Sequence, residues 1–229
     1  MVGVHMGSGR RYSGLDAEER TTQRRAAILA AALELFGTTG YAATSVKQIC
    51  REAGLTERYF YESFRDREAS LAALYAELTG QMRDATVKAV GDALPGPGGD
   101  APAAGHADTG VPAYLSEATR SGLAAFIGFL AEDPRRARVV LIEVVGVSPG
   151  LEDRRHAVLR EFAGLVSDVW SAQPDGPAAT ETQRLTTVGL VGAVNHLLVN
   201  WLMEGRHQAP SVLVDVCATL FTAARERLW

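Results

Sequence analysis

The sequence contains little cysteine. Its two cysteines, Cys50 and Cys217, are far apart and show no CxxC spacing. A disulfide-stabilised scaffold would need more cysteines, and a thiolate metal site would need clustered ones. We therefore expect both residues to be small buried side chains in a reducing compartment.

Long uninterrupted apolar runs are also missing. The most apolar stretches, residues 138–147 and 188–203, are interrupted by Glu143 in the first and by Asn195, His196 and Asn200 in the second. Neither supplies the roughly 20 apolar residues that a membrane span needs. Residues 1–14 are rich in Gly, Ser and Arg and lack the apolar core of a secretory signal. We expect a cytoplasmic protein with no membrane partner.

The chain has 229 residues, of which 47% are hydrophobic and 22% charged, as in an ordinary globular protein. The net charge of −4 argues at first against a nucleic-acid partner. However, residues 1–67 contain ten basic and eight acidic residues (+2), whereas residues 68–229 contain thirteen and nineteen (−6). The acidic total therefore does not exclude a small DNA-binding domain at the N-terminus.

Hydrophobic residues recur with a helical period along almost the whole chain, and no alternating strand pattern is seen. The sequence therefore predicts an all-α fold with a flexible linker over the Pro- and Gly-rich residues 91–112. Four helices are expected before this linker, the fourth over about 67–90. Five more are expected after it, at about 113–131, 134–147, 151–172, 179–205 and 210–227.

Two short helices around Gly54 have the pattern of a helix-turn-helix. The segment Ser45–Gln48 has the spacing of a capping box, which marks the start of the first short helix. Gly54 permits a tight turn, and apolar residues on both helices can fix their crossing angle. The outward face of the second helix carries polar and aromatic residues between Glu57 and Ser63.

These residues resemble the TetR family of transcriptional repressors. The matching residues are 25–36, Gly40-Tyr41, Thr44–Val46, Ile49-Cys50, 53–56, Tyr61, Phe64, Arg67-Glu68 and Leu71, so the resemblance covers about residues 20–75 without a gap. It implies a three-helix N-terminal DNA-binding domain, followed by a helical bundle that binds a ligand and forms a dimer.

The resemblance also implies which residues contact DNA. Phosphate contacts would come from Thr44 or Ser45, Tyr61 and Arg67, and a helix N-terminus is a natural seat for a phosphate. Base-edge contacts would come from Lys47, Glu57, Arg58, Tyr59 and, further out, Ser63. Arg58 could read a guanine or only contact a phosphate, and Tyr59 could touch a thymine methyl or pack on the sugar–phosphate edge.

The expected domains are a flexible arm over 1–17, a helix-turn-helix domain over 18–66 and a ligand-binding and dimerisation domain over 67–229. Arg10 and Arg11 on the arm could enter a minor groove, or the arm could be a disordered tail.

The second domain contains candidates for a dimer interface and a pocket. By resemblance, the last two helices of each subunit form the homodimer interface, with small or polar positions permitting close helix approach. These candidates are Gly189, Gly192, Ala193, His196, Asn200, Leu213, Val216 and Leu220. The candidate pocket residues are Phe126, Phe129, Glu143, Phe162, Trp170, Asn195 and Trp201. Because Glu143 lies in an apolar stretch, Arg135, Arg136 or a ligand must satisfy its carboxylate.

The sequence thus favours a ligand-responsive, sequence-specific regulator, most simply a repressor released from its double-stranded DNA operator by a small-molecule effector. Because no catalytic or metal-ligand constellation is recognisable, we expect no enzyme activity, metal or cofactor. The alternative is a helical small-molecule carrier or enzyme in which the N-terminal hairpin is only structural.

Overall fold

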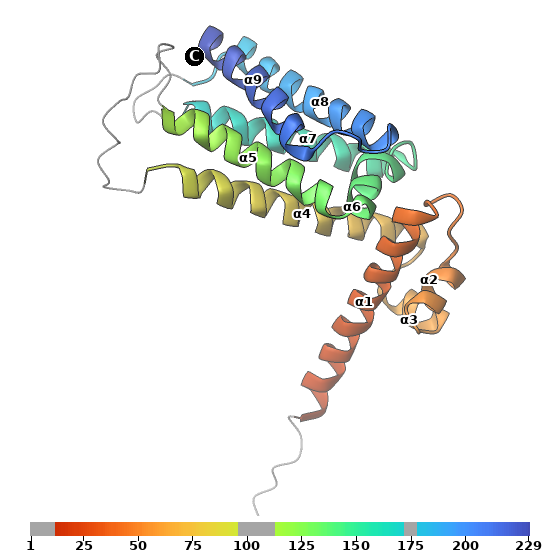
Figure 1. Ribbon diagram of the computed structural model, residues 1–229. Coiled ribbons are helices and arrows are strands. Elements are labelled where there is room, and N and C mark those ends of the chain that lie inside the picture. Colours follow the sequence, from red (N-terminus) through yellow and green to blue (C-terminus); the bar gives the residue numbers. More distant parts are fainter. Residues whose placement is uncertain (1–11, 96–112, 172–177) are drawn as a thin grey trace, which may run out of the picture. The chain divides into compact units, whose positions relative to one another are not determined.

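The computed structural model describes residues 12–95, 113–171 and 178–229, with side chains described from residue 18 onwards. Within these residues the chain forms α-helices, one short π-helix and no strand, which confirms the all-α prediction. The helices form two compact units, residues 1–74 and residues 75–229. Figure 1 shows the order of the helices along the chain.

Unit 1 contains α1 (Tyr12–Thr38), α2 (Val46–Glu52), α3 (Glu57–Ser63) and the first two turns of α4 (Arg67–Ala93). Its core is built from fully buried apolar side chains of all four helices, including Ile28, Phe36, Ile49, Phe60 and Leu71. The short helices depend on these contacts, because helices of two turns are marginal by themselves in water.

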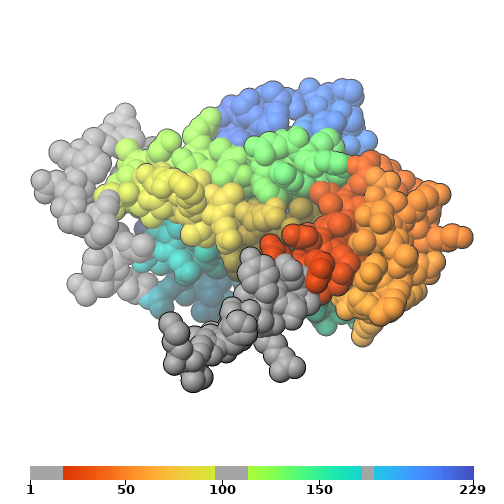
Figure 2. Space-filling view, turned by 90° about the horizontal axis from the view of Figure 1, so that it is seen from below, coloured from red at the N-terminus to blue at the C-terminus, as the bar shows by residue number. Residues whose placement is uncertain are grey.

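Unit 2 contains the rest of α4, then α5 (Ala113–Glu132), α6 (Pro134–Arg138), a π-helix (Val139–Glu143), α7 (Pro149–Ser171), α8 (Glu181–Met203) and α9 (Pro210–Leu228). Helix α5 packs on α9, and α7 packs on α8. Helix α4 lies beside α5 (Figure 1; Figure 2). The two helices approach closely at Gly122 of α5, where an added Cβ would lie only 2.7 Å from Cγ2 of Val90 on α4.

Three boundaries differ from those expected from the sequence. Helix α1 begins at Tyr12, inside the arm expected over 1–17, because its backbone continues through Gly14 and no proline separates Tyr12 from the periodic segment. The unit boundary by contacts falls inside α4, after Leu74. The helix expected over 134–147 becomes a π-helix at Val139 and ends at Glu143, before Gly146, which has φ +73°. Most of the expected linker, residues 96–112, lies outside the described residues, as do Arg10 and Arg11.

Candidate functional site

Helices α2 and α3 form a helix-turn-helix within unit 1. The capping box is present: the Ser45 hydroxyl accepts the Gln48 backbone N–H, and the Gln48 side chain accepts the Ser45 N–H. Gly54 in the turn has φ +66°, a left-handed conformation that favours glycine. On α3, Phe60 is fully buried and Phe64 follows at its C-terminal end, their ring centroids 5.7 Å apart. These buried rings fix which side of α3 faces the core, and the opposite side of the helix therefore faces outward.

The outer side of this motif presents polar and aromatic side chains. Ser45, Lys47, Glu57, Arg58 and Tyr61 are exposed. The Arg58 side chain is 85% exposed and pairs with Glu62 one turn later, at 3.1 Å between Nε and Oε1. An exposed ion pair of this kind contributes only about 0–1 kcal/mol, so either partner can exchange it for a contact to a ligand.

Two arginines of α1 hold α3 from the side. The Arg24 guanidinium lies over the Tyr59 ring at 4.5 Å, and Arg25 lies over the Phe64 ring at 4.3 Å. Arg25 also donates a hydrogen bond to the Ser63 carbonyl at 3.1 Å. Sequence reasoning missed both residues, because nothing in the local pattern links positions so far apart in the chain.

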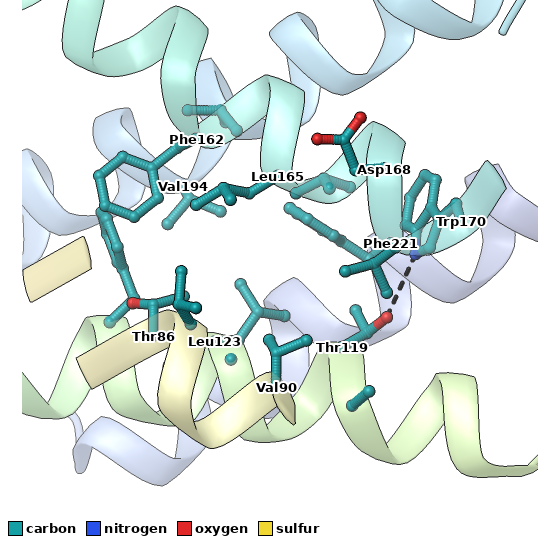
Figure 3. Close-up of a pocket in the computed structure, with 17 residues that line it drawn as sticks. Thr86, Val90, Thr119, Leu123, Phe162, Leu165, Asp168, Trp170, Val194 and Phe221 are labelled. Atoms are coloured by element: carbon teal, nitrogen blue, oxygen red, sulfur yellow. Dashed lines mark hydrogen bonds between the residues drawn. The ribbon is translucent and has the colours of Figure 1, made fainter. Parts of the chain in front are cut away.

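Unit 2 encloses a cavity of about 190 Å³. Its lining is formed by apolar side chains of α4, α5, α7, α8 and α9, and Figure 3 shows them facing one another around an open centre. The few polar groups lie at its edge. Trp170 Nε1 donates to Thr119 Oγ1 at 3.2 Å, and this hydroxyl donates to the Leu115 carbonyl at 2.8 Å. Because these groups satisfy one another, the cavity favours an apolar occupant.

One face of unit 2 carries exposed apolar side chains on both α8 and α9. On α8 these include Leu185 and Val188, and on α9 Val212, Val216 and Leu220, each between 43% and 61% exposed. Gly189 and Gly192 lie on the same part of α8, and a Cβ on either would meet no atom within 4 Å. The packing within the chain therefore does not require glycine there.

Helix α8 is the one helix among the described residues whose length and apolar composition would allow it to cross a membrane. Its exposed positions also include His196 and Asn200, whose side-chain nitrogens lie 3.3 Å apart. A mixed surface of this kind is typical of a helix that meets another protein surface.

The N-terminal segment matches a known protein family. Residues 28–74, which contain the C-terminal part of α1, the helix-turn-helix and the start of α4, match the family model of the bacterial regulatory proteins of the TetR family. Unit 1 is a TetR-family N-terminal domain. This confirms the resemblance deduced from the sequence.

Solved structures of similar fold extend over both units. The fatty acid degradation regulator FadR from Bacillus halodurans matches with a TM-score of 0.70 and 19% identity, over 87% of this chain and 94% of that one. FadR from Bacillus subtilis, solved in complex with stearoyl-CoA, matches with a TM-score of 0.70 and 17% identity, over 86% of this chain and 97% of that one. A putative transcriptional regulator from Pseudomonas aeruginosa matches with a TM-score of 0.64 and 21% identity, over 96% of this chain and 99% of that one. At these identities the likeness concerns the fold, an N-terminal domain followed by a helical bundle.

Within the TetR-family domain, the expected phosphate contacts have different environments. Ser45 is exposed, whereas Thr44 is 1% exposed and its hydroxyl donates inward to the Gly40 carbonyl at 2.8 Å. Arg67 is half-buried, donates to the Thr44 carbonyl and lies over the Tyr41 ring at 4.1 Å. Thr44 and Arg67 therefore have structural roles within the domain, whereas Ser45 and Tyr61, which is 55% exposed, have a free outer side.

The candidate pocket residues divide into two groups. Phe126, Phe162 and Trp170 line the cavity, the first two with their rings edge to face at 4.9 Å. The others lie away from it: the Phe129 ring is covered by Arg136, Trp201 Nε1 donates to the Gln208 carbonyl at 2.9 Å, and Asn195 is half-buried on α8. Aromatic residues at a helical period do not reveal which of them border a cavity.

Glu143 is satisfied within the chain by an arginine that was not considered from the sequence. Its carboxylate accepts Arg138 Nε at 2.8 Å. Arg135 is engaged instead by Asp133, the N-cap of α6, and hydrogen bonds from Arg135 hold the Asp133 pKa below its usual range. The π-helical turn between Arg138 and Glu143 brings these two side chains together.

The candidate interface residues lie mostly on the exposed face of α8 and α9. Gly189, Gly192, His196, Asn200, Val216 and Leu220 are exposed, Ala193 is half-buried and Leu213 is buried. Val216 and Leu220 on α9 and the two glycines on α8 are thus exposed, and the described residues leave them uncovered.

Proposed function

We propose that the chain is a ligand-responsive, sequence-specific DNA-binding transcriptional regulator, acting as a repressor that a small molecule releases from its operator. The observation that carries this proposal is the helix-turn-helix of the TetR-family domain, whose outer face is polar and exposed. The proposal places the chain in the cytoplasm, with DNA, an effector and a second copy as its partners, and without enzyme activity.

DNA recognition would require two copies. Residues 1–67 carry a charge of only +2, which is weak for a single DNA-binding domain. A twofold dimer would place two α3 helices in successive major grooves, about 34–36 Å apart. The apolar face of α8 and α9 is the surface that we propose to form this dimer, with its glycines permitting close helix approach.

Arg58 is the side chain that we expect to distinguish bases. We predict that Arg58→Ala reduces affinity for the selected duplex by about 1–3 kcal/mol, roughly fivefold to 150-fold, because a bidentate contact to guanine is lost. Affinity for random duplex should change much less. The measurement is a gel-shift titration on a site selected from randomised duplexes.

Arg65→Ala provides the matched control. Arg65 follows α3, is 78% exposed and pairs with Asp66, so its removal takes the same charge from the same domain. If Arg58→Ala weakens selected and random duplex equally, Arg58 contacts phosphate alone. If no preferred sequence emerges from the selection, the DNA-binding proposal itself fails.

We propose that the effector is largely apolar and occupies the cavity of unit 2. The lining consists almost entirely of hydrocarbon surface, and the similarly folded FadR of Bacillus subtilis was solved with stearoyl-CoA. An acyl chain is the natural candidate for such a lining. A cavity of 190 Å³ somewhat exceeds the roughly 150 Å³ apolar cavity that holds benzene, so longer chains require movement of its walls.

Filling the cavity should uncouple the effector from DNA. Val194 of α8 lines the cavity and is 5% exposed. We predict that Val194→Trp weakens binding of an acyl probe such as decanoate by about tenfold or more, because the larger side chain occupies the ligand's space. Operator binding without ligand should persist, whereas release by the probe should not.

The control for this variant is Val145→Trp, which enlarges an exposed valine outside the cavity. Isothermal titration calorimetry measures probe binding, and gel shifts measure release. Unchanged probe affinity in Val194→Trp would show that the ligand binds elsewhere.

A further inference from the structure

Arg225 of α9 is a buried cation that has no ion-pair partner among the described residues. The residue is 8% exposed, and its Nε and Nη1 atoms are buried without any hydrogen-bond partner. Burial lowers its pKa, and the phenol of Tyr114 on α5 acts in the opposite direction. A guanidinium removed from water with two of its nitrogens unsatisfied is costly, so it marks a place where an anion would be strongly favoured.

Arg225 lies close in the chain to one end of the cavity, which is lined by Phe221 and Trp170. Phe221 lines the cavity one turn before Arg225 on α9, and Trp229 follows one turn after it. Both rings contact Trp170, a second lining residue, with centroid separations of 5.8 Å for Phe221 and 4.9 Å for Trp229. Along α9, Arg225 therefore lies between Phe221 and Trp229, whose rings both contact Trp170, and it is about 6 Å along the helix axis from Phe221.

The charged residues around the cavity also indicate where an anionic group of a ligand could lie. Asp168 is the one charged residue of the lining, and its exposed carboxylate lies at the edge (Figure 3). It would repel an anionic group placed beside it. No basic side chain lines the cavity among the described residues, and Arg225 lies one turn after the lining residue Phe221 on α9.

We propose that Arg225 is the anion-binding group of the effector site, and that the effector is an amphiphile whose carboxylate pairs with Arg225 while its hydrocarbon chain occupies the cavity. This inference rests on the proposed effector role of the cavity. For the carboxylate to reach the guanidinium, it must pass the Phe221 and Trp170 rings, which would move aside as the ligand enters.

The test compares three probes with the same decyl chain: decanoate, methyl decanoate and decyltrimethylammonium. Isothermal titration calorimetry on the unaltered full-length protein should show that decanoate binds roughly tenfold or more tightly than its neutral ester, because a charge-assisted pair is gained. The cationic probe should bind more weakly than the ester.

Arg225→Met should reduce the preference for decanoate over the ester to less than about twofold while retaining the ester. Arg227→Met is the matched control, because Arg227 is exposed on the same helix, and it should keep the full preference. Equal binding of decanoate and ester by the unaltered protein would overturn the anion site alone. This comparison needs no variant, so it holds even if Arg225→Met does not fold.

Two other results would also be decisive. A preference for decanoate that survives in a folded Arg225→Met protein would overturn the assignment to Arg225. Failure of the unaltered protein to bind any of the three probes would overturn both the anion site and the acyl-binding cavity.

Discussion

Replacement of Phe60 by alanine is expected to unfold the helix-turn-helix while unit 2 remains folded. Phe60 is fully buried in the core of unit 1, where its ring packs beside Phe64. Truncating such a side chain costs about 3–5 kcal/mol. Whole domains are stable by only about 5–15 kcal/mol, so a domain of this size loses a large fraction of its stability.

Native-state hydrogen exchange of the α2 and α3 amides measures this effect. Their protection should fall by about two to three orders of magnitude in Phe60→Ala, and DNA binding should be lost. All three tryptophans lie in unit 2, so an unchanged unfolding midpoint by tryptophan fluorescence would show that unit 2 is intact.

Tyr61→Ala is the matched control for this variant. Tyr61 is the next residue on α3 and an aromatic of similar size, but it is 55% exposed. It should keep the protection of α2 and α3 and weaken DNA binding only through the lost phosphate contact. Equal loss of protection in both variants would contradict the assignment of Phe60 to the core.

A second large effect is expected at the apolar face of α8 and α9. The double substitution of Val216 and Leu220 by arginine places two charges of the same sign on each copy of a twofold interface. Both side chains are exposed in the single chain, so its fold should be unaffected. The protein should change from a dimer to a monomer of 24.4 kDa, and operator affinity should collapse because two half-sites are no longer bound together.

Light scattering after size-exclusion chromatography measures the molecular mass, and a gel shift measures the binding. Val145→Arg is the control, because Val145 is equally exposed but lies outside this face. A double variant that still elutes as a dimer would place the interface elsewhere.

Local signals in the sequence predicted local structure well. The Ser45–Gln48 capping box and the turn at Gly54 are confirmed because each depends on residues within a few positions of one another. Apart from the segment that becomes the π-helix, the helices after residue 113 are confirmed to within about two residues for the same reason, since prolines mark several of their starts.

Contacts between distant segments could not be predicted in this way. Arg24 and Tyr59 belong to different helices, and nothing in either segment indicates the other. The choice of Arg138 rather than Arg135 as the partner of Glu143 depends on a π-helical turn that has no clear sequence signature. That Arg225 Nε and Nη1 have no hydrogen-bond partner in the described part of the chain could not be predicted either, because it depends on the surroundings of the residue in three dimensions.

The continuity of α4 has a mechanical consequence. Thr86, Val87 and Val90 on this helix line the cavity, while its first residue, Arg67, belongs to the TetR-family domain. The span from Arg67 to Thr86 is about 28 Å at 1.5 Å per residue. In a rigid rod of that length, a rotation of about 5° at the cavity displaces the far end by roughly 2.5 Å. In the proposed dimer, opposite displacements in the two copies would change the separation of their α3 helices by about 5 Å, a large change compared with the groove repeat of about 34–36 Å.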